Sequence, residues 1–311
     1  MSSNIRNKIK FACIIIFTMI ILTIIIYASC KLHNYFLNEQ LLEACLKGDI
    51  SQVEELIERG ADTNYVGKSI KVTPLFIATG NNDLRLIELL VEHDADIDMK
   101  LGATKMNALI NSIVLECDLE ITEYFIKKGS NVESAMSNGN TALIVATLMR
   151  EVSKAEVLIN NGADINARND VGSNSILVAI ESKNFEMIDF LLDKGATYTV
   201  NEGLLIFSSI GDRAKVNELI EKGADVNYKH KESEKSALLY AIEEGHFEIV
   251  ELLIENGSNV NQRNSYGGTG LLDAVANNDL KITELLIKNG ADVNLKSDKG
   301  FTALILATIE G

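Results

Sequence analysis

The sequence has few of the residues that carry catalytic or metal chemistry. Its 311 residues include four cysteines, four histidines, one proline and no tryptophan. The cysteines are too few and too scattered for a disulfide framework or a zinc site. The histidines are spread along the chain and suggest no Cys–His or Ser–His–Asp arrangement. We therefore expect no enzymatic activity, no catalytic residue, no metal ligand and no cofactor.

The chain also lacks an excess of basic residues. Its formal net charge is −15 at pH 7, and 47% of its residues are hydrophobic. Nucleic-acid binding needs a basic surface, so we expect no nucleic-acid partner. Three short motifs resemble binding or modification sites but do not match them fully. The first, Gly267–Gly270, lacks the Lys-Ser/Thr of a phosphate loop. The Asp–Asn pairs recur in separate turns rather than in one calcium loop, and the sequon at 256–258 falls on a helix-capping turn.

One short phrase recurs along the chain. ELLIKNGADVN at 284–294 has close copies at 55–64, 157–166, 218–227 and 251–261. Aligned on the glycine or its equivalent, the successive spacings are 34, 35, 33, 33, 28, 34 and 33 residues. The aligned positions are Gly60, Asp94, Gly129, Gly162, Gly195, Gly223, Gly257 and Gly290. A period near 33 predicts a repeat protein with eight units and the start of a ninth over residues 38–311.

The residues of one unit, 236–261, predict helix, turn, helix and polar loop. Leu238, Ala241 and Ile242 have helical spacing, and a second apolar helical run begins at 247. Gly257 stands where a C-terminal cap takes the left-handed conformation. In another unit, Thr73 and Pro74 are typical of an N-cap and a first helical residue. One unit is too small to bury its apolar face and must stack on its neighbours.

These motifs resemble those of the ankyrin-repeat family. The family pattern T-P-L-H-x-A is met by Thr73-Pro74-Leu75 with Ala78, and the pattern G-A-D-V-N by residues 290–294. The resemblance implies an all-α solenoid of helix-turn-helix units with hairpin loops, and no real sheet. The family histidine of T-P-L-H is apolar in every unit here, and we expect extra apolar burial in its place. These residues are Phe76, Ile110, Ile144, Leu177, Leu205, Leu239, Leu272 and Ile305.

The sixth repeat is short. The 28 residues from Gly195 to Gly223 drop about five, and Thr197 and Thr199 stand in place of the usual Asp/Asn turn. Three interpretations are open: ordinary decay of a repeat, a notch in the binding surface, or a seam between repeats 1–5 and 6–9.

An apolar segment precedes the repeats. Residues 11–30 carry no charge and are long enough to span a bilayer as a helix. We expect a short basic tail at 1–10, a transmembrane or signal helix at 11–30, a linker at 31–37 and the repeat array at 38–311. Arg6, Lys8 and Lys10 precede the apolar run, while Lys31 and His33 follow it. The positive-inside bias favours a cytoplasmic N-terminus with the repeats on the non-cytoplasmic side of the membrane.

Three interpretations of this segment compete. The length favours a retained single-pass anchor. A cleaved signal peptide, suggested by the small residues Ala28 and Ser29, would give a secreted soluble effector. A lipoprotein signal would acylate Cys30, although Tyr27 stands where that motif has leucine.

Charge placement suggests where the array binds. In the ankyrin family the loops between repeats project as finger-like hairpins that contact partners. The fingers of this chain carry eleven basic and six acidic residues, whereas the second helices are rich in glutamate. We expect basic fingertips, an acidic outer side, and an acidic partner, either a protein or anionic lipid headgroups, that binds the fingers. The candidate contact residues are Tyr65, Lys68, Lys71, Lys100, Lys105, Arg168, Tyr228, Lys229, Lys231, Arg263, Tyr266, Lys296 and Lys299.

The sequence therefore predicts a membrane-tethered ankyrin-repeat scaffold for protein–protein interaction, without catalysis and without a small-molecule substrate. A secreted ankyrin effector and a structural spacer without a specific partner are the alternatives.

Overall fold

The computed structural model describes the backbone of residues 3–310 and the side chains of residues 17–309. The side chains of the predicted basic tail, and those of residues 11–16 of the apolar segment, lie outside this range. The chain forms two compact units, residues 1–134 and 135–311. This division falls between Ser134 and Ala135 and does not coincide with the short repeat, where a seam was one of the three interpretations.

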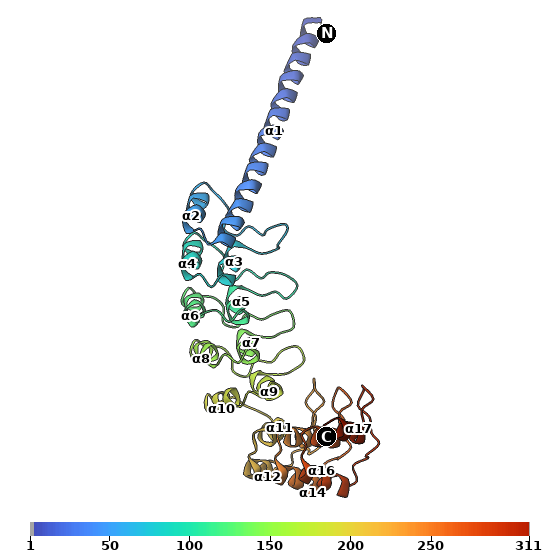
Figure 1. The fold of residues 1–311 in the computed structure, drawn as a ribbon. Helices are drawn as coiled ribbons and strands as arrows, with labels where there is room; N and C mark the ends of the chain where they lie inside the picture. The colour runs from blue at the N-terminus through green and yellow to red at the C-terminus, as the bar shows by residue number, and fades with distance from the viewer. Residues whose placement is uncertain (1–2, 311) are drawn as a thin grey trace. The chain divides into compact units, whose positions relative to one another are not determined.

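Both units are built from pairs of short helices (Figure 1). The first unit contains α1 (Ser3–Lys47), α2 (Ile50–Glu58), α3 (Pro74–Gly80), α4 (Leu84–Glu92), α5 (Ala108–Val114) and α6 (Leu119–Lys127). The second contains α7 (Ala142–Leu148), α8 (Val152–Asn160), α9 (Ser175–Glu181), α10 (Phe185–Asp193), α11 (Val200–Ile210), α12 (Arg213–Glu221), α13 (Ala237–Glu243), α14 (Phe247–Glu255), α15 (Gly270–Ala276), α16 (Leu280–Lys288) and α17 (Ala303–Glu310).

Each unit stacks its helices in two rows. In the first unit α1, α3 and α5 pack in succession as inner helices, with α2 and α4 in the outer row. In the second unit α7, α9, α11, α13, α15 and α17 form the inner row. The hairpin loops project from the inner rows, as the family resemblance implied (Figure 1). From residue 3 to residue 310 the backbone forms no strand, and the loops contain only isolated bridges such as Arg263 to Thr269.

The helix ends follow the predicted signals. Thr73 is the N-cap of α3, its hydroxyl accepts from the Phe76 amide, and Pro74 is the first helical residue. Gly257 has a φ of +88° after α14, where any side chain would be strained. The apolar substitutes for the family histidine are mostly buried; Ile110, Leu205 and Leu239 are at most 1% exposed. Extra apolar burial at that position is therefore confirmed in most repeats.

The recurring polar phrase forms hydrogen bonds within its own loop and to the loop of the next repeat. In each copy the first Asp or Asn accepts a bond from the amide two residues on, as Asp292 Oδ1 does from the Asn294 amide at 2.9 Å. The Asn that closes the phrase reaches the next repeat. Asn261 Oδ1 accepts from the Asp292 amide at 2.8 Å, and its Nδ2 donates to the Gly290 carbonyl at 3.0 Å. Asn64 and Asn227 make the same pair of bonds.

The predicted linker differs from the structure. Residues 31–37 are helical within α1, which continues without a break into the first repeat. Leu37, Leu41 and Leu42 are at most 2% exposed, so packing in the first repeat holds this end of α1 in the helix. A helix rises roughly 1.5 Å per residue, so these seven residues span about 10 Å. Fully extended, they would span roughly 23–25 Å.

We predict that Asn261→Ala lowers the free energy of unfolding by about 1–3 kcal/mol, because two backbone groups of the next loop lose their partner. Urea denaturation followed by circular dichroism measures the change. Asn294→Ala is the matched control, since Asn294 occupies the same position in the loop before α17 and its side chain makes no hydrogen bond with a residue that the structure describes. Equal losses in both variants would contradict a bridging role for Asn261.

Candidate functional site

The short repeat replaces its finger with an extra helical turn. Most inner helices have seven residues, but α11 has 11. Thr199 caps this helix, and Thr199 and Glu202 form a capping box in which each side chain bonds the other residue's amide. Glu202 aligns with Ser236 and Thr269, which end the fingers of the following repeats. A finger is therefore missing from the row, as the notch interpretation of this repeat requires.

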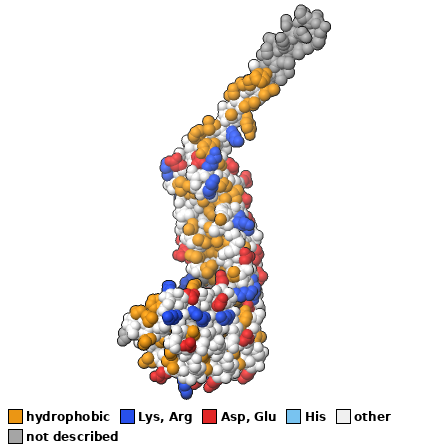
Figure 2. Space-filling view, turned by 90° about the vertical axis from the view of Figure 1, so that its right-hand side faces the viewer, with side chains coloured by type: hydrophobic (Ala, Val, Ile, Leu, Met, Phe, Trp, Pro, Cys, Tyr) orange, Lys and Arg blue, Asp and Glu red, His pale blue; other side chains and the backbone are white. Residues whose placement is uncertain are grey.

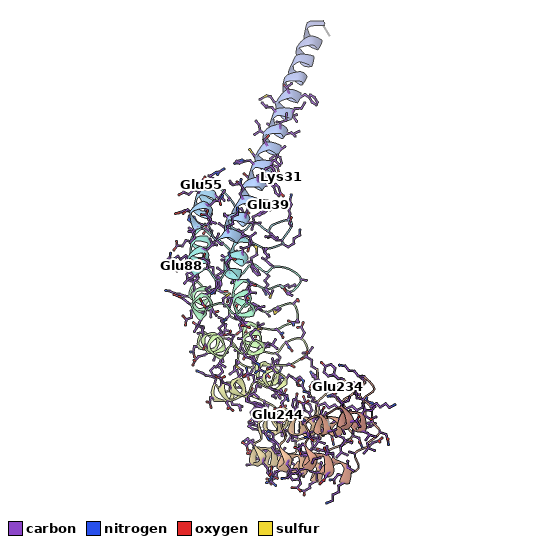
Figure 3. All side chains as sticks on the ribbon, viewed as in Figure 1. Lys31, Glu39, Glu55, Glu88, Glu234 and Glu244 are labelled. Atoms are coloured by element: carbon purple, nitrogen blue, oxygen red, sulfur yellow. The ribbon has the colours of Figure 1, made fainter. Side chains whose placement is uncertain are left out.

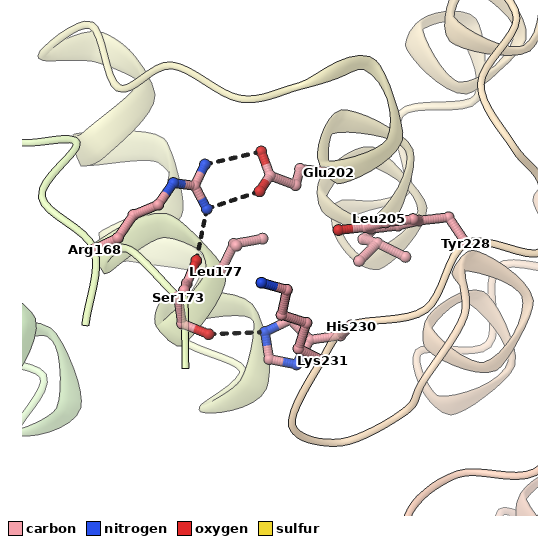
Figure 4. A pocket seen from close by; sticks show the side chains of 9 residues that line it. Arg168, Ser173, Leu177, Glu202, Leu205, Tyr228, His230 and Lys231 are labelled. Carbon is pink, nitrogen blue, oxygen red and sulfur yellow. Dashed lines mark hydrogen bonds and ion pairs between the residues drawn. The ribbon is translucent and has the colours of Figure 1, made fainter. Parts of the chain in front are cut away.

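A cavity of about 120 Å³ lies where the finger is absent (Figure 4). The preceding loop contributes Arg168, Gly172 and Ser173, and the following loop contributes Tyr228, His230 and Lys231. Leu177 and Leu205 of the inner helices α9 and α11 form its apolar part. Three of the predicted contact residues, Arg168, Tyr228 and Lys231, thus meet at one site in the second unit.

Arg168 and Glu202 form a two-pronged ion pair at one side of this cavity. Arg168 Nη1 and Nη2 lie 2.9 and 3.2 Å from the two carboxylate oxygens of Glu202, and Nη1 also donates to the Gly172 carbonyl at 2.7 Å. Burial acts to raise the pKa of Glu202, but the bonds from Arg168 and Thr199 outweigh it and lower that pKa. Glu202 is therefore an ionised, 5% exposed residue.

A polar cluster connects the two loops across the gap. Ser173 Oγ lies 3.4 Å from His230 Nε2, and His230 Nδ1 lies 3.1 Å from Glu181 Oε1. Ser233 and Tyr240 also bond Glu181. Burial lowers the pKa of His230, against the raising effect of Glu181, so the imidazole is neutral at pH 7.

The order Ser–His–Glu is the order of an acyl-transfer triad, which the sequence did not suggest. The serine–histidine distance exceeds the roughly 2.6–3.2 Å of an activated nucleophile. Ser173 is 1% exposed, and its amide already donates to Asn169 Oδ1, so it does not serve an oxyanion. The geometry fits a polar bridge between loops. Ser173 and His230 are 57 residues apart in the chain, Glu181 and Ser233 are 52 apart, and the shortened repeat lies between the members of each pair.

The other predicted contact residues lie in separate fingers. In the second unit, Lys229 Nζ donates to the Arg263 carbonyl at 3.0 Å, and Arg263 Nη2 donates to the Lys296 carbonyl at 2.6 Å. Lys229 and Arg263 both align with Arg168, and in these two repeats the basic side chain at this position ties its finger to the next. Figure 2 shows a row of Lys and Arg side chains across this part of the second unit. Tyr266 is 75% exposed beside them.

The first unit holds the remaining candidates. Tyr65 donates its hydroxyl to Glu39 of α1 at 2.7 Å, and Lys68 lies over the Tyr35 ring at 4.1 Å. Lys71, Lys100 and Lys105 are exposed. On the opposite side, Glu55 and Glu88 lie on the outer helices α2 and α4, as predicted for an acidic outer side (Figure 3).

Several predicted basic fingertips are paired within the chain. Arg168, Lys229 and Arg263 each contact a carboxylate, of Glu202, Glu234 and Asp298 respectively. Lys71, Lys105, Lys231, Lys296 and Lys299 make no ion pair with a described residue. The charge available to a partner is therefore concentrated on fewer residues than the sequence count indicated. Likewise, no group of three or more potential metal-binding side chains occurs among residues 17–309.

The comparison with known proteins agrees with this architecture. The family model described as ankyrin repeats (3 copies) matches residues 41–135, 112–202 and 204–297. The chain belongs to the ankyrin-repeat family, a class of protein-interaction scaffolds.

Particular relatives are similar over parts of the array. A putative ankyrin repeat protein L91 of Acanthamoeba polyphaga mimivirus is 31% identical over 115 residues, which are 33% of this chain and 18% of the relative. The ankyrin repeat and KH domain-containing protein mask-1 of Caenorhabditis elegans is 28% identical over 229 residues, or 72% of this chain and 9% of the relative. Ankyrin repeat and SOCS box protein 6 of Mus musculus is 30% identical over 120 residues, which are 37% of this chain and 29% of the relative. The chain thus spans less than a third of each relative's length.

We predict that Glu202→Gln lowers the free energy of unfolding at pH 7 by about 1–3 kcal/mol, because Arg168 keeps its charge but loses its carboxylate partner. The pKa of Glu202 is lowered in the folded state, so its contribution is complete above the ordinary value near 4.5 and disappears as the pH falls below it. Denaturation of both proteins at several pH values measures this difference, which should shrink in acid.

Glu218→Gln is the control for charge removal. Glu218 pairs with Lys215 and Lys222 on the exposed surface of α12, where water screens the pairs and the expected change is close to zero. A pH-independent loss in Glu202→Gln would contradict the ion-pair explanation.

Proposed function

We propose that this protein is a membrane-tethered ankyrin scaffold that presents its fingers to a protein partner and performs no covalent step. The observation that supports the tether is the exposure of α1. Its apolar side chains between Phe17 and Tyr27 are 41–69% exposed. Figure 2 shows them as a hydrophobic surface on the free part of the helix.

The exposed run argues against a core helix of a soluble protein. The helical span Phe17–Lys47 is long and apolar enough to cross a membrane, and only 6% of its apolar window is buried. An apolar helix of this kind left in water has an unfavourable free energy, which a bilayer removes. The continuity of α1 into the first repeat supports a close, stiff connection between the anchor and the array.

The side of the membrane and the partner belong to the same proposal. The bias of Lys and Arg around the apolar run favours a cytoplasmic N-terminus with repeats on the non-cytoplasmic side. The exposed lysines at the fingertips favour an acidic protein partner. The exposed Cys30 keeps the lipoprotein alternative open, and that form also tethers the array.

Fractionation and protease protection test the tether and its orientation. With a C-terminal tag, we expect the repeats in the membrane fraction of cells, cleaved by protease added to intact cells. Residues 1–29 should remain attached, as shown by mass spectrometry of the isolated protein.

The other outcomes are distinct. Cleavage only after the cells are opened would reverse the orientation. A soluble protein that begins after residue 28 would exclude the anchor and favour the secreted effector. A membrane-bound protein that begins at Cys30 with an added lipid mass would replace the transmembrane helix with a lipid anchor.

A further inference from the structure

The cavity left by the missing finger contains hydrogen-bond donors without acceptors. Figure 4 shows the Lys231 ammonium and the Tyr228 hydroxyl pointing into it. Neither group has a hydrogen-bond or ion-pair partner among the described residues. Arg168, by contrast, is held in place by Glu202 and the Gly172 carbonyl. Arg168 is thus fixed by the fold, while the Lys231 and Tyr228 donors remain available to an incoming acceptor.

The residues that line the cavity carry a net positive charge. Arg168 and Lys231 outnumber Glu202, and the neighbouring His230 is neutral because burial lowers its pKa. Burial, and next the nearby Glu202, raise the pKa of Tyr228, so its phenol keeps a proton to donate. Two further carboxylates act on His230: Glu181, which is occupied by Ser233 and Tyr240, and Glu232, which follows Lys231 in the loop and does not line the cavity. A group with one negative charge and two acceptor oxygens complements this arrangement.

The size of the cavity limits what enters. Its 120 Å³ is below the roughly 300–1,000 Å³ of pockets for small-molecule ligands. It suits one short side chain with a methylene stem, which Leu177 and Leu205 would contact, and a charged head. Lys231 Nζ also lies close to the Gly172 backbone, where an added Cβ would stand 2.9 Å from it. Because glycine leaves this wall free of a side chain, the ammonium fits between the two loops.

We propose that this cavity, between the loops 166–173 and 227–235, binds one aspartate or glutamate side chain of the protein partner, with Lys231 and Tyr228 as its direct contacts and Arg168 as the positioning residue that fixes Glu202. The inference rests on the proposed protein-binding function and deepens it. The shortened repeat is then a specificity element, since an ordinary finger at this place would fill the notch.

Selection from a displayed library of short random peptides tests the proposal, with the full-length wild-type chain in nanodiscs as the bait. We expect the selected peptides to share an acidic residue at one position. For a synthetic peptide of that sequence, Lys231→Gln should weaken binding about tenfold or more, because the carboxylate loses its charged partner. Millimolar acetate should not abolish binding, whereas it would if the site held only a free small carboxylate, and that result would overturn the peptide assignment.

Lys229→Gln is the matched control. Lys229 is in the same finger and has the same charge, but its ammonium contacts Glu234 and the Arg263 carbonyl outside the cavity. We expect it to bind the peptide as the wild type does. Equal weakening by both substitutions would show a diffuse basic surface and overturn the pocket. Binding that depends on Lys296 and Lys299 but not on Lys231 would do the same, while leaving the scaffold function intact.

A charge swap separates direct contact from structural damage. Lys231→Glu should reject the acidic peptide and accept its variant with lysine at the shared position. Thermal unfolding should be unchanged in both Lys231 variants, because the side chain is exposed and holds no bond in the fold. If the lysine peptide fails to bind Lys231→Glu, direct pairing with Lys231 is wrong. If no peptide binds the wild-type chain, the pocket and the protein-binding function both fail.

Discussion

The structure depends on the fact that a pair of helices of seven and nine residues cannot bury its own apolar face. Every inner helix must therefore lie against the inner helix of the next repeat, and that demand fixes the spacing of the whole chain. The polar loops serve the same end. Asn64, Asn227 and Asn261 each clamp the following loop with one acceptor and one donor. Stacking energy and loop geometry thus repeat with the same period, and the recurring phrase in the sequence reflects both.

The short repeat is the exception to this period, and the cavity with its polar and charged residues lies beside it. In the short repeat the closing position of the phrase is Thr199, which caps a helix instead of reaching forward. The bridging role passes to Asn201, whose Oδ1 accepts from the Asp225 amide at 2.8 Å. The short repeat therefore keeps an asparagine-to-amide hydrogen bond to the next loop, although it lacks a finger. Arg168 lacks the neighbouring finger that Arg263 has, and turns to Glu202 of the longer helix.

The repeat pattern made most of the fold predictable from sequence, for physical reasons. Caps such as Thr73 and turns such as Gly257 are local signals, and the stacking rule extends them to tertiary structure. The candidate site was only partly predictable. Arg168, Tyr228 and Lys231 were identified as loop residues, but the sequence gives no sign that they meet. Their meeting, and the contacts of Ser173 and Glu181 across the gap, arise from a deletion that brings non-consecutive fingers together.

The number of basic residues in the fingers is a weaker guide to the charge available to a partner than the ion pairs seen in the structure. A lysine near a carboxylate of the next finger, such as Lys229, contributes little field to a partner, whereas Lys231 two residues away keeps its full charge. Net charge per loop does not separate the two. What separates them is the missing finger, which leaves Lys231 beside a cavity, whereas Lys229 contacts the following finger. The shortened repeat thus leaves both a cavity and an exposed charge at its edge. In our proposal, the acidic side chain of the partner takes the place that a full-length finger would occupy.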